Sequence, residues 1–133
     1  MGNRDLKDPI IWTHFLFILN SILWLLVKEP VAAFFVLCSN VLSTMYHIYS
    51  EQNKLWHTLD TACAVLTLSV TLFIAAPHTT LFGWVLLISS LSTSLYFKNE
   101  ARRSDYDSWH SGWHVGVFFG QALLALTIES SVI

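Results

Sequence analysis

Charged residues are scarce in this sequence. Asp, Glu, Lys and Arg make up 12% of its 133 residues, whereas a soluble domain usually carries about 25%. The net charge is −2 and the basic residues form no concentrated tract, so the composition gives no argument for nucleic acid as a partner. The two cysteines, Cys38 and Cys63, fall inside apolar stretches, where we expect packing residues rather than a disulfide.

Two signatures of other protein classes are also missing. No small-residue cleavage site follows the first apolar run, so we expect this run to be a helix and not a signal peptide. The chain has no His-Glu-x-x-His sequence, which disfavours a zinc protease of that type.

Long uncharged runs are what the sequence does have, at residues 9–27, 30–50, 61–97 and 108–128. A helix needs roughly 20 mainly apolar residues to cross a bilayer. The run 61–97 is too long for one crossing, and Pro77 within "AAPHTT" divides it, because proline breaks a helix. The sequence therefore predicts an all-α, multi-pass transmembrane bundle forming one domain over residues 1–133, with five spans at about 10–27, 31–49, 55–76, 80–97 and 109–128.

The basic residues predict the orientation of these spans. If the N-terminus lies on side A of the membrane, only Lys28 falls on side B. Side A then collects Arg4, Lys7, Lys54, Lys98, Arg102 and Arg103. Because cytoplasmic loops carry an excess of Lys and Arg, we expect the N-terminus and side A to be cytoplasmic.

Polar side chains inside the predicted spans converge on one depth of the membrane. Ser43 and His47 lie one turn apart near the side A end of the second span. Asp60 lies in the first turns of the third span, and His110 and His114 lie in the first turns of the fifth. All five fall in the cytoplasmic third of the membrane, where ionisable residues are functional candidates.

This set of side chains predicts a metal site. Three neutral imidazoles with one open position make a zinc centre of the catalytic type. His110 and His114, at i and i+4, would bind Zn²⁺ from one helix, and His47 would bind it from another. Asp60 would act as a general base or orient a ligand, and Ser43 would donate to a developing oxyanion or orient the water.

Other polar residues of the spans are less informative. Asn40 continues the helical face of Ser43 and His47, because the three are spaced at i, i+3 and i+7. His57 is expected at the membrane interface. His14 and His78 have no partner that the sequence identifies.

Three short motifs carry these residues: "STMYH" at 43–47, "TLD" at 58–60 and "HSGWH" at 110–114. Their order and depth resemble the CREST superfamily, whose members include alkaline ceramidases, adiponectin and progestin receptors, Per-like proteins and myomaker. The resemblance implies an intramembrane zinc ion held by His47, His110 and His114, with Ser43 and Asp60 completing a hydrolytic site. Ceramidase relatives cleave a lipid amide into a fatty acid and a sphingoid base.

Members of that superfamily usually have seven spans, two more than the five predicted here. Three interpretations are open: a minimal form of the fold, a cavity closed by pairing with a second copy of the chain, or a site that binds the metal without hydrolysis.

We therefore expect an intramembrane zinc-dependent hydrolase that cleaves an amide or ester of a membrane lipid near the cytoplasmic face. One alternative is a non-enzymatic receptor, lipid-binding protein or membrane-remodelling scaffold, because a structural zinc ion would use the same histidines. A haem-binding electron-transfer subunit is a weaker alternative, since His110 and His114 are too close together to ligate two stacked haems. The sequence predicts an integral membrane protein without distinguishing the ER or Golgi from the plasma membrane.

Overall fold

The computed structural model describes residues 8–49 and 53–129, and all regular secondary structure in this part of the chain is helical. The elements are α1 (Pro9–Leu26), α2 (Pro30–Tyr49), α3 (Lys54–Ala75), the short 3-10 helix η1 (Ala76–His78), α4 (Leu81–Ala101) and α5 (Tyr106–Glu129). The described residues contain no strand. All five α-helices are long and apolar enough to cross a membrane, which confirms the predicted all-α transmembrane bundle.

Capping side chains fix where three of the helices begin. Asp8 precedes Pro9 at the start of α1, and its carboxylate accepts a hydrogen bond from the backbone N–H of Ile10 at 2.8 Å. Asn53 at α3 and Thr80 at α4 accept in the same way from their own first turns. Short polar side chains at these positions bind N–H groups that have no partner within the helix.

Two boundaries differ from the predicted spans. α4 continues to Ala101 and α5 begins at Tyr106, whereas the uncharged runs suggested boundaries near 97 and 109. A helix does not have to end where its charged residues begin, because Lys98 can extend along the helix while its ammonium group reaches the interface. Between α3 and α4, the predicted break at Pro77 is confirmed as η1.

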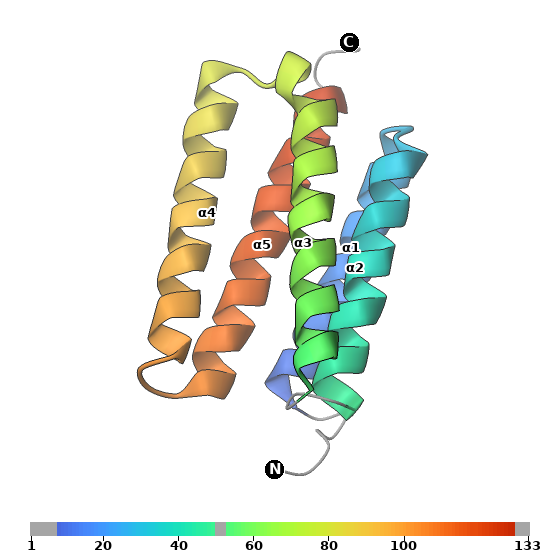
Figure 1. Cartoon of the computed structure of the whole chain (residues 1–133). Coiled ribbons are helices and arrows are strands. Elements are labelled where there is room, and N and C mark those ends of the chain that lie inside the picture. The colour runs from blue at the N-terminus through green and yellow to red at the C-terminus, as the bar shows by residue number, and fades with distance from the viewer. Residues whose placement is uncertain (1–7, 50–52, 130–133) are drawn as a thin grey trace.

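The helices pack in the order α4, α5, α1, α2, α3, each against the next. The consecutive helices α3 and α4 do not pack on one another in this way, and α5 lies between and behind them (Figure 1). The apolar core lies at the end of the bundle away from the N-terminus, and consists of Trp24, Ala32, Ala33, Val36, Ala75, Leu87, Leu124, Ala125 and Ile128. The polar site described below lies at the other end.

Small residues bring α4 and α5 into close contact. Ser90 Oγ donates a hydrogen bond to the carbonyl of Gly116 at 2.8 Å, and Ser94 is fully buried beside the same glycine. A Cβ added at Gly116 would overlap Ser94 Oγ, whereas one at Gly120 would make only ordinary contacts. Such small-residue contacts are a common way for membrane helices to associate.

We expect Gly116→Ala to reduce the free energy of unfolding by about 1–3 kcal/mol, because the added methyl group forces α4 and α5 apart. Gly120→Ala makes the same chemical change one turn away and should leave stability nearly unchanged. Unfolding of both variants in mixed micelles measures the difference. Equal stability of the two variants would contradict this account of the α4–α5 contact.

Candidate metal centre

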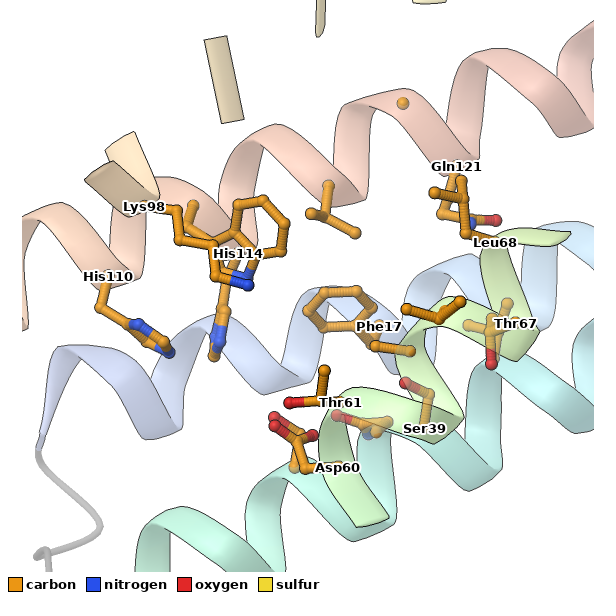
Figure 2. Close-up of a pocket in the computed structure, with 18 of the residues that line it drawn as sticks. Phe17, Ser39, Asp60, Thr61, Thr67, Leu68, Lys98, His110, His114 and Gln121 are labelled. Atoms are coloured by element: carbon orange, nitrogen blue, oxygen red, sulfur yellow. The ribbon is translucent and has the colours of Figure 1, made fainter. Parts of the chain in front are cut away.

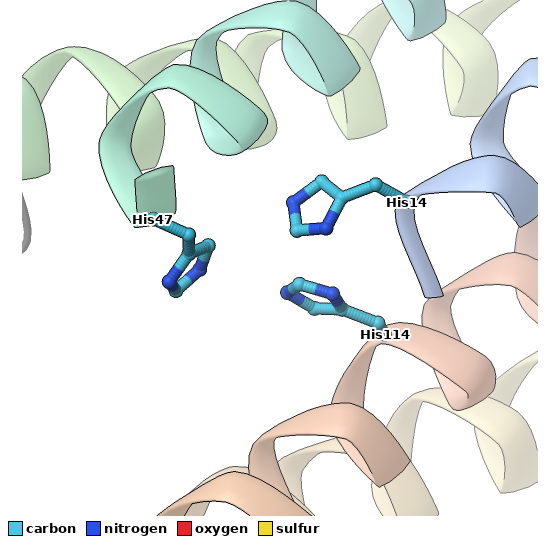
Figure 3. Close-up of side chains that lie close together, drawn as sticks. All are labelled: His14, His47 and His114. Atoms are coloured by element: carbon cyan, nitrogen blue, oxygen red, sulfur yellow. The ribbon is translucent and has the colours of Figure 1, made fainter. Parts of the chain in front are cut away.

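Three histidines from three helices meet inside the bundle. His14 of α1, His47 of α2 and His114 of α5 each offer one ring nitrogen, and these nitrogens all lie within 4.8 Å of one another (Figure 3). The three side chains are only 3%, 2% and 4% exposed. The rings of His14 and His114 meet edge to face, with centroids 4.5 Å apart. This cluster has the donors to hold a metal ion.

A hydrogen bond to the backbone sets the tautomer of His14. Its Nδ1 lies 2.6 Å from the carbonyl oxygen of Ile10, one turn earlier in α1. Because a carbonyl only accepts, Nδ1 must carry the hydrogen, and in the neutral imidazole Nε2 then carries the lone pair. That Nε2 is buried and has no hydrogen-bond partner among the described residues. Histidines that bind metals typically donate one ring N–H to a backbone carbonyl and bind the ion with the other ring nitrogen.

Thr13 sets the tautomer of His114 by the same route. The Thr13 hydroxyl donates its hydrogen to the carbonyl of Ile10 at 2.7 Å. With that hydrogen used, Thr13 Oγ1 can only accept from His114 Nδ1, which lies 2.8 Å away. The lone pair of His114 is therefore on Nε2. One carbonyl near the start of α1 thus orients two of the three histidines.

A fourth histidine adjoins this group. His110 Nε2 lies 3.2 Å from His47 Nε2, and the His110 ring stacks on Tyr106. Two nitrogens bound to one zinc ion at 2.0–2.1 Å in tetrahedral geometry would be about 3.3 Å apart. His110 is therefore placed where it could bind the same ion as His47.

Ser43 and Asp60 lie together in a cavity next to the histidines. Asp60 lies near Ser43 across the α2–α3 contact, and it interacts electrostatically with His57 and Lys98. The cavity has a volume of about 230 Å³ and is lined by side chains of all five helices. Ser43, Asp60, His110 and His114 all face it, as Figure 2 shows for the last three.

The five predicted site residues thus lie at one end of one bundle, and their roles stay predictions. The difference from the predicted ligand set is His14, which the structure groups with His47 and His114 in place of His110. The sequence contains no motif that includes His14, so the sequence identifies no partner for this residue. Its depth was the available signal: it lies in the second turn of α1, at the same end as the other histidines.

Comparison with known proteins adds no relative. No family model, no curated protein and no solved structure matches the chain.

The packing of the three histidine rings bears on the alternative that the site binds haem. A haem ligated from two helices lies between facing imidazoles, but His14, His47 and His114 are in edge-to-face contact, with centroids 4.5–5.7 Å apart. Such contact leaves no space for a porphyrin between them.

We expect His14→Ala to lower the affinity for Zn²⁺, used as the probe ion, by about 100-fold or more, because it removes a buried nitrogen donor. His78→Ala, at the exposed opposite end of the bundle, is the matched control and should bind as the parent chain does. Competition with a chromophoric chelator measures both affinities. If His110→Ala abolishes binding while His14→Ala retains it, the ligand set assigned from the structure is wrong.

Thr13→Val should weaken Zn²⁺ binding by about 10-fold, within the range seen when a partner of a metal ligand is removed. The substitution keeps the shape of the side chain but leaves His114 Nδ1 without its acceptor. Thr58→Val, a change at an exposed hydroxyl that bonds only within α3, is the control. Unchanged affinity of the Thr13 variant in the same competition assay would contradict the assigned tautomer.

Proposed function

We propose that this protein is an intramembrane zinc-dependent hydrolase that cleaves an amide or ester of a membrane lipid. The observation that carries the proposal is the buried cluster of His14, His47 and His114 in a bundle of five apolar helices. Through His114, this cluster adjoins the cavity that Ser43 and Asp60 also line. No chain segment supplies a donor to the buried His14 Nε2 among the described residues. An ion is the natural partner of such a nitrogen.

The donor set fits zinc. His14, His47 and His114 would hold the ion with neutral imidazole nitrogens, which suit Zn²⁺ and leave a fourth position for a small molecule. A bound zinc ion would supply Lewis acidity and lower the pKa of water toward neutrality. The protein's part is to fix the three rings in advance, and the Ile10 carbonyl does this for two of them.

Asp60 and Ser43 supply the remaining polar groups of the site. The Asp60 carboxylate faces the same cavity as His110 and His114, so it is placed to take a proton from a water that attacks a lipid carbonyl. Ser43 lines the same cavity and would orient Asp60 or the attacking water by donating its hydroxyl hydrogen. Lys98 also lines the cavity, with its ammonium group 4.7 Å from the centre of the Trp113 ring, and it adds a positive charge that could stabilise an oxyanion in the cavity.

The way α3 and α4 are arranged favours a substrate that comes from the bilayer. Asp60 and Thr61 of α3 and Leu91 and Lys98 of α4 line the cavity from its two sides. These two helices do not pack on each other as the other neighbours do, and they are the two helices with the least buried side chains. A lipid chain could therefore reach the cavity between them without crossing water.

The excess of basic residues at the end of the bundle that holds the cluster supports a cytoplasmic site. The order of the motifs at Ser43, His47, Asp60, His110 and His114 resembles the CREST superfamily, which supports lipid hydrolysis as the reaction class. An amide or an ester would serve equally, because both present a carbonyl to the same polar groups.

A structural zinc site is the second candidate, and His110 is the residue that favours it. With His110 Nε2 at 3.2 Å from His47 Nε2, four histidines could surround one ion and close its coordination. Closed four-ligand sites are typical of structural zinc. In that case the ion would join α1, α2 and α5 in a non-enzymatic membrane protein.

We expect Asp60→Asn to reduce the turnover of lipid amides or esters by about 100-fold or more, because it removes the proton acceptor, while the zinc content stays at that of the parent chain. Asp105→Asn is the matched control, since Asp105 is an exposed acid at the same end of the bundle. Release of fatty acid from a panel of ceramides and phospholipids in bilayer nanodiscs, with metal analysis of each sample, provides the measurement. Zinc binding without any hydrolysis by the parent chain would favour the structural site instead.

A further inference from the structure

A second group of polar side chains lies deeper in the same cavity. Asn40 is seven residues from His47 on α2, and Gln121 is seven residues from His114 on α5. At 1.5 Å per residue, each lies about 10 Å from the histidine level toward the middle of the bundle. Both side chains line the cavity, and they are only 7% and 4% exposed. In Figure 2, Gln121 lies along α5 from His114, facing Leu68 of α3.

The orientation of the Gln121 amide follows from its neighbour Thr71. The Thr71 hydroxyl has a single hydrogen, which it directs to the carbonyls of Thr67 and Leu68 in its own helix at 2.9 and 3.1 Å. Thr71 Oγ1 can therefore only accept from Gln121, whose Nε2 lies 3.1 Å away. This fixes the amide nitrogen toward α3 and directs Gln121 Oε1 elsewhere. That oxygen is buried without a hydrogen-bond partner among the described residues.

Asn40 repeats the same feature from the other side of the cavity. Its Oδ1 is also buried without a partner in the part of the chain that the structure describes. The nearby hydroxyl of Thr67 cannot serve it, because it donates to the carbonyl of Phe35 at 3.0 Å. The deep level therefore presents two acceptor oxygens, while the hydroxyl hydrogens of Thr67 and Thr71 are used within the protein.

We propose that Asn40 and Gln121 form a subsite for a hydrogen-bond donor, such as a hydroxyl group, carried near the middle of a lipid chain whose head lies at the histidine cluster. This proposal rests on the proposed lipid site for its orientation, but the subsite itself is built only from residues about 10 Å away from the histidines. It assigns the cavity a preference for hydroxylated acyl chains over plain ones.

The preference follows from the cost of burying an unpaired oxygen. Asn40 Oδ1 and Gln121 Oε1 are already shielded from water and have no hydrogen-bond partner among the described residues, and a plain hydrocarbon chain in the cavity would give neither of them a hydrogen. A hydroxyl group at that depth would donate its hydrogen to one of these oxygens. It would not compete for the hydroxyl hydrogens of Thr67 and Thr71, which are donated to backbone carbonyls. Asn20 lies at a similar depth on α1, with its Oδ1 also buried and without a partner among the described residues, but it does not line the cavity.

The test compares the binding of stearic acid with that of its analogue hydroxylated near the middle of the chain. The full-length protein in nanodiscs should bind the hydroxylated acid about tenfold more tightly, the effect of one buried hydrogen bond. Gln121→Met and Asn40→Leu, which keep side-chain volume and remove the acceptor, should each reduce this ratio toward one. Asn20→Leu is the matched control outside the cavity and should keep the ratio of the parent chain.

Three outcomes would overturn the proposal. The first is equal affinity of the parent chain for the two acids, which would indicate that the polar groups bind water. The second is an unchanged affinity ratio in both cavity variants, and the third is loss of the affinity ratio in the Asn20 variant. Each measurement is repeated after removal of metal by a chelator. If the chain binds no zinc and hydrolyses no lipid, the hydroxyl preference should still be present, so failure of the proposed function is distinguishable from failure of this subsite. Thermal unfolding of each variant confirms that it is folded under the assay conditions.

Discussion

The hydrocarbon of a bilayer offers no hydrogen bonds, so each polar group inside this bundle must find its partner in the protein or in something bound to it. Most of the described hydroxyl groups meet this requirement locally, as Ser21, Ser69, Ser89 and Thr71 do by donating to carbonyls of their own helices. The few atoms that do not are therefore informative. Five such side-chain atoms are buried without a partner among the described residues. Asn40 Oδ1 and Gln121 Oε1 belong to residues that line the cavity, and His14 Nε2 belongs to the histidine cluster beside it, whereas Asn20 Oδ1 and Trp24 Nε1 lie elsewhere.

The carbonyl of Ile10 has a central part in this arrangement. It accepts from His14 Nδ1 and from the Thr13 hydroxyl, which in turn accepts from His114 Nδ1. Asp8 and Pro9 fix this turn of α1 at the start of the helix. The N-terminal cap of α1 is thus connected, through Ile10 and Thr13, to the direction of the Nε2 lone pairs of His14 and His114. This is why α1 contributes to the site although it carries none of the motifs that the sequence makes visible.

The sequence was sufficient for the helices and for the depth of the polar residues, because both depend on distance along a helix. Run length and Pro77 predict five spans, and helical rise places Ser43, His47, Asp60, His110 and His114 near one end. The sequence pattern within one span does not determine which helices become neighbours. His14 joins the cluster only because α1 packs between α2 and α5, and no periodicity within a single span reports that. The same holds for Gln121, whose role depends on the hydroxyl of Thr71 on α3.

The helix order also shows where a bundle of five spans would differ from one of seven. The three histidines of the cluster come from α1, α2 and α5, and α1 packs against both of the other two, so this group needs no further helix. Additional spans between the third and the last would fall beside α3 and α4, the consecutive pair that lacks mutual packing. Under the proposed function, the open side between α3 and α4 would admit a lipid chain to the cavity. The identity of the chain that enters would then depend on Asn40 and Gln121, the polar groups at the far end of the cavity.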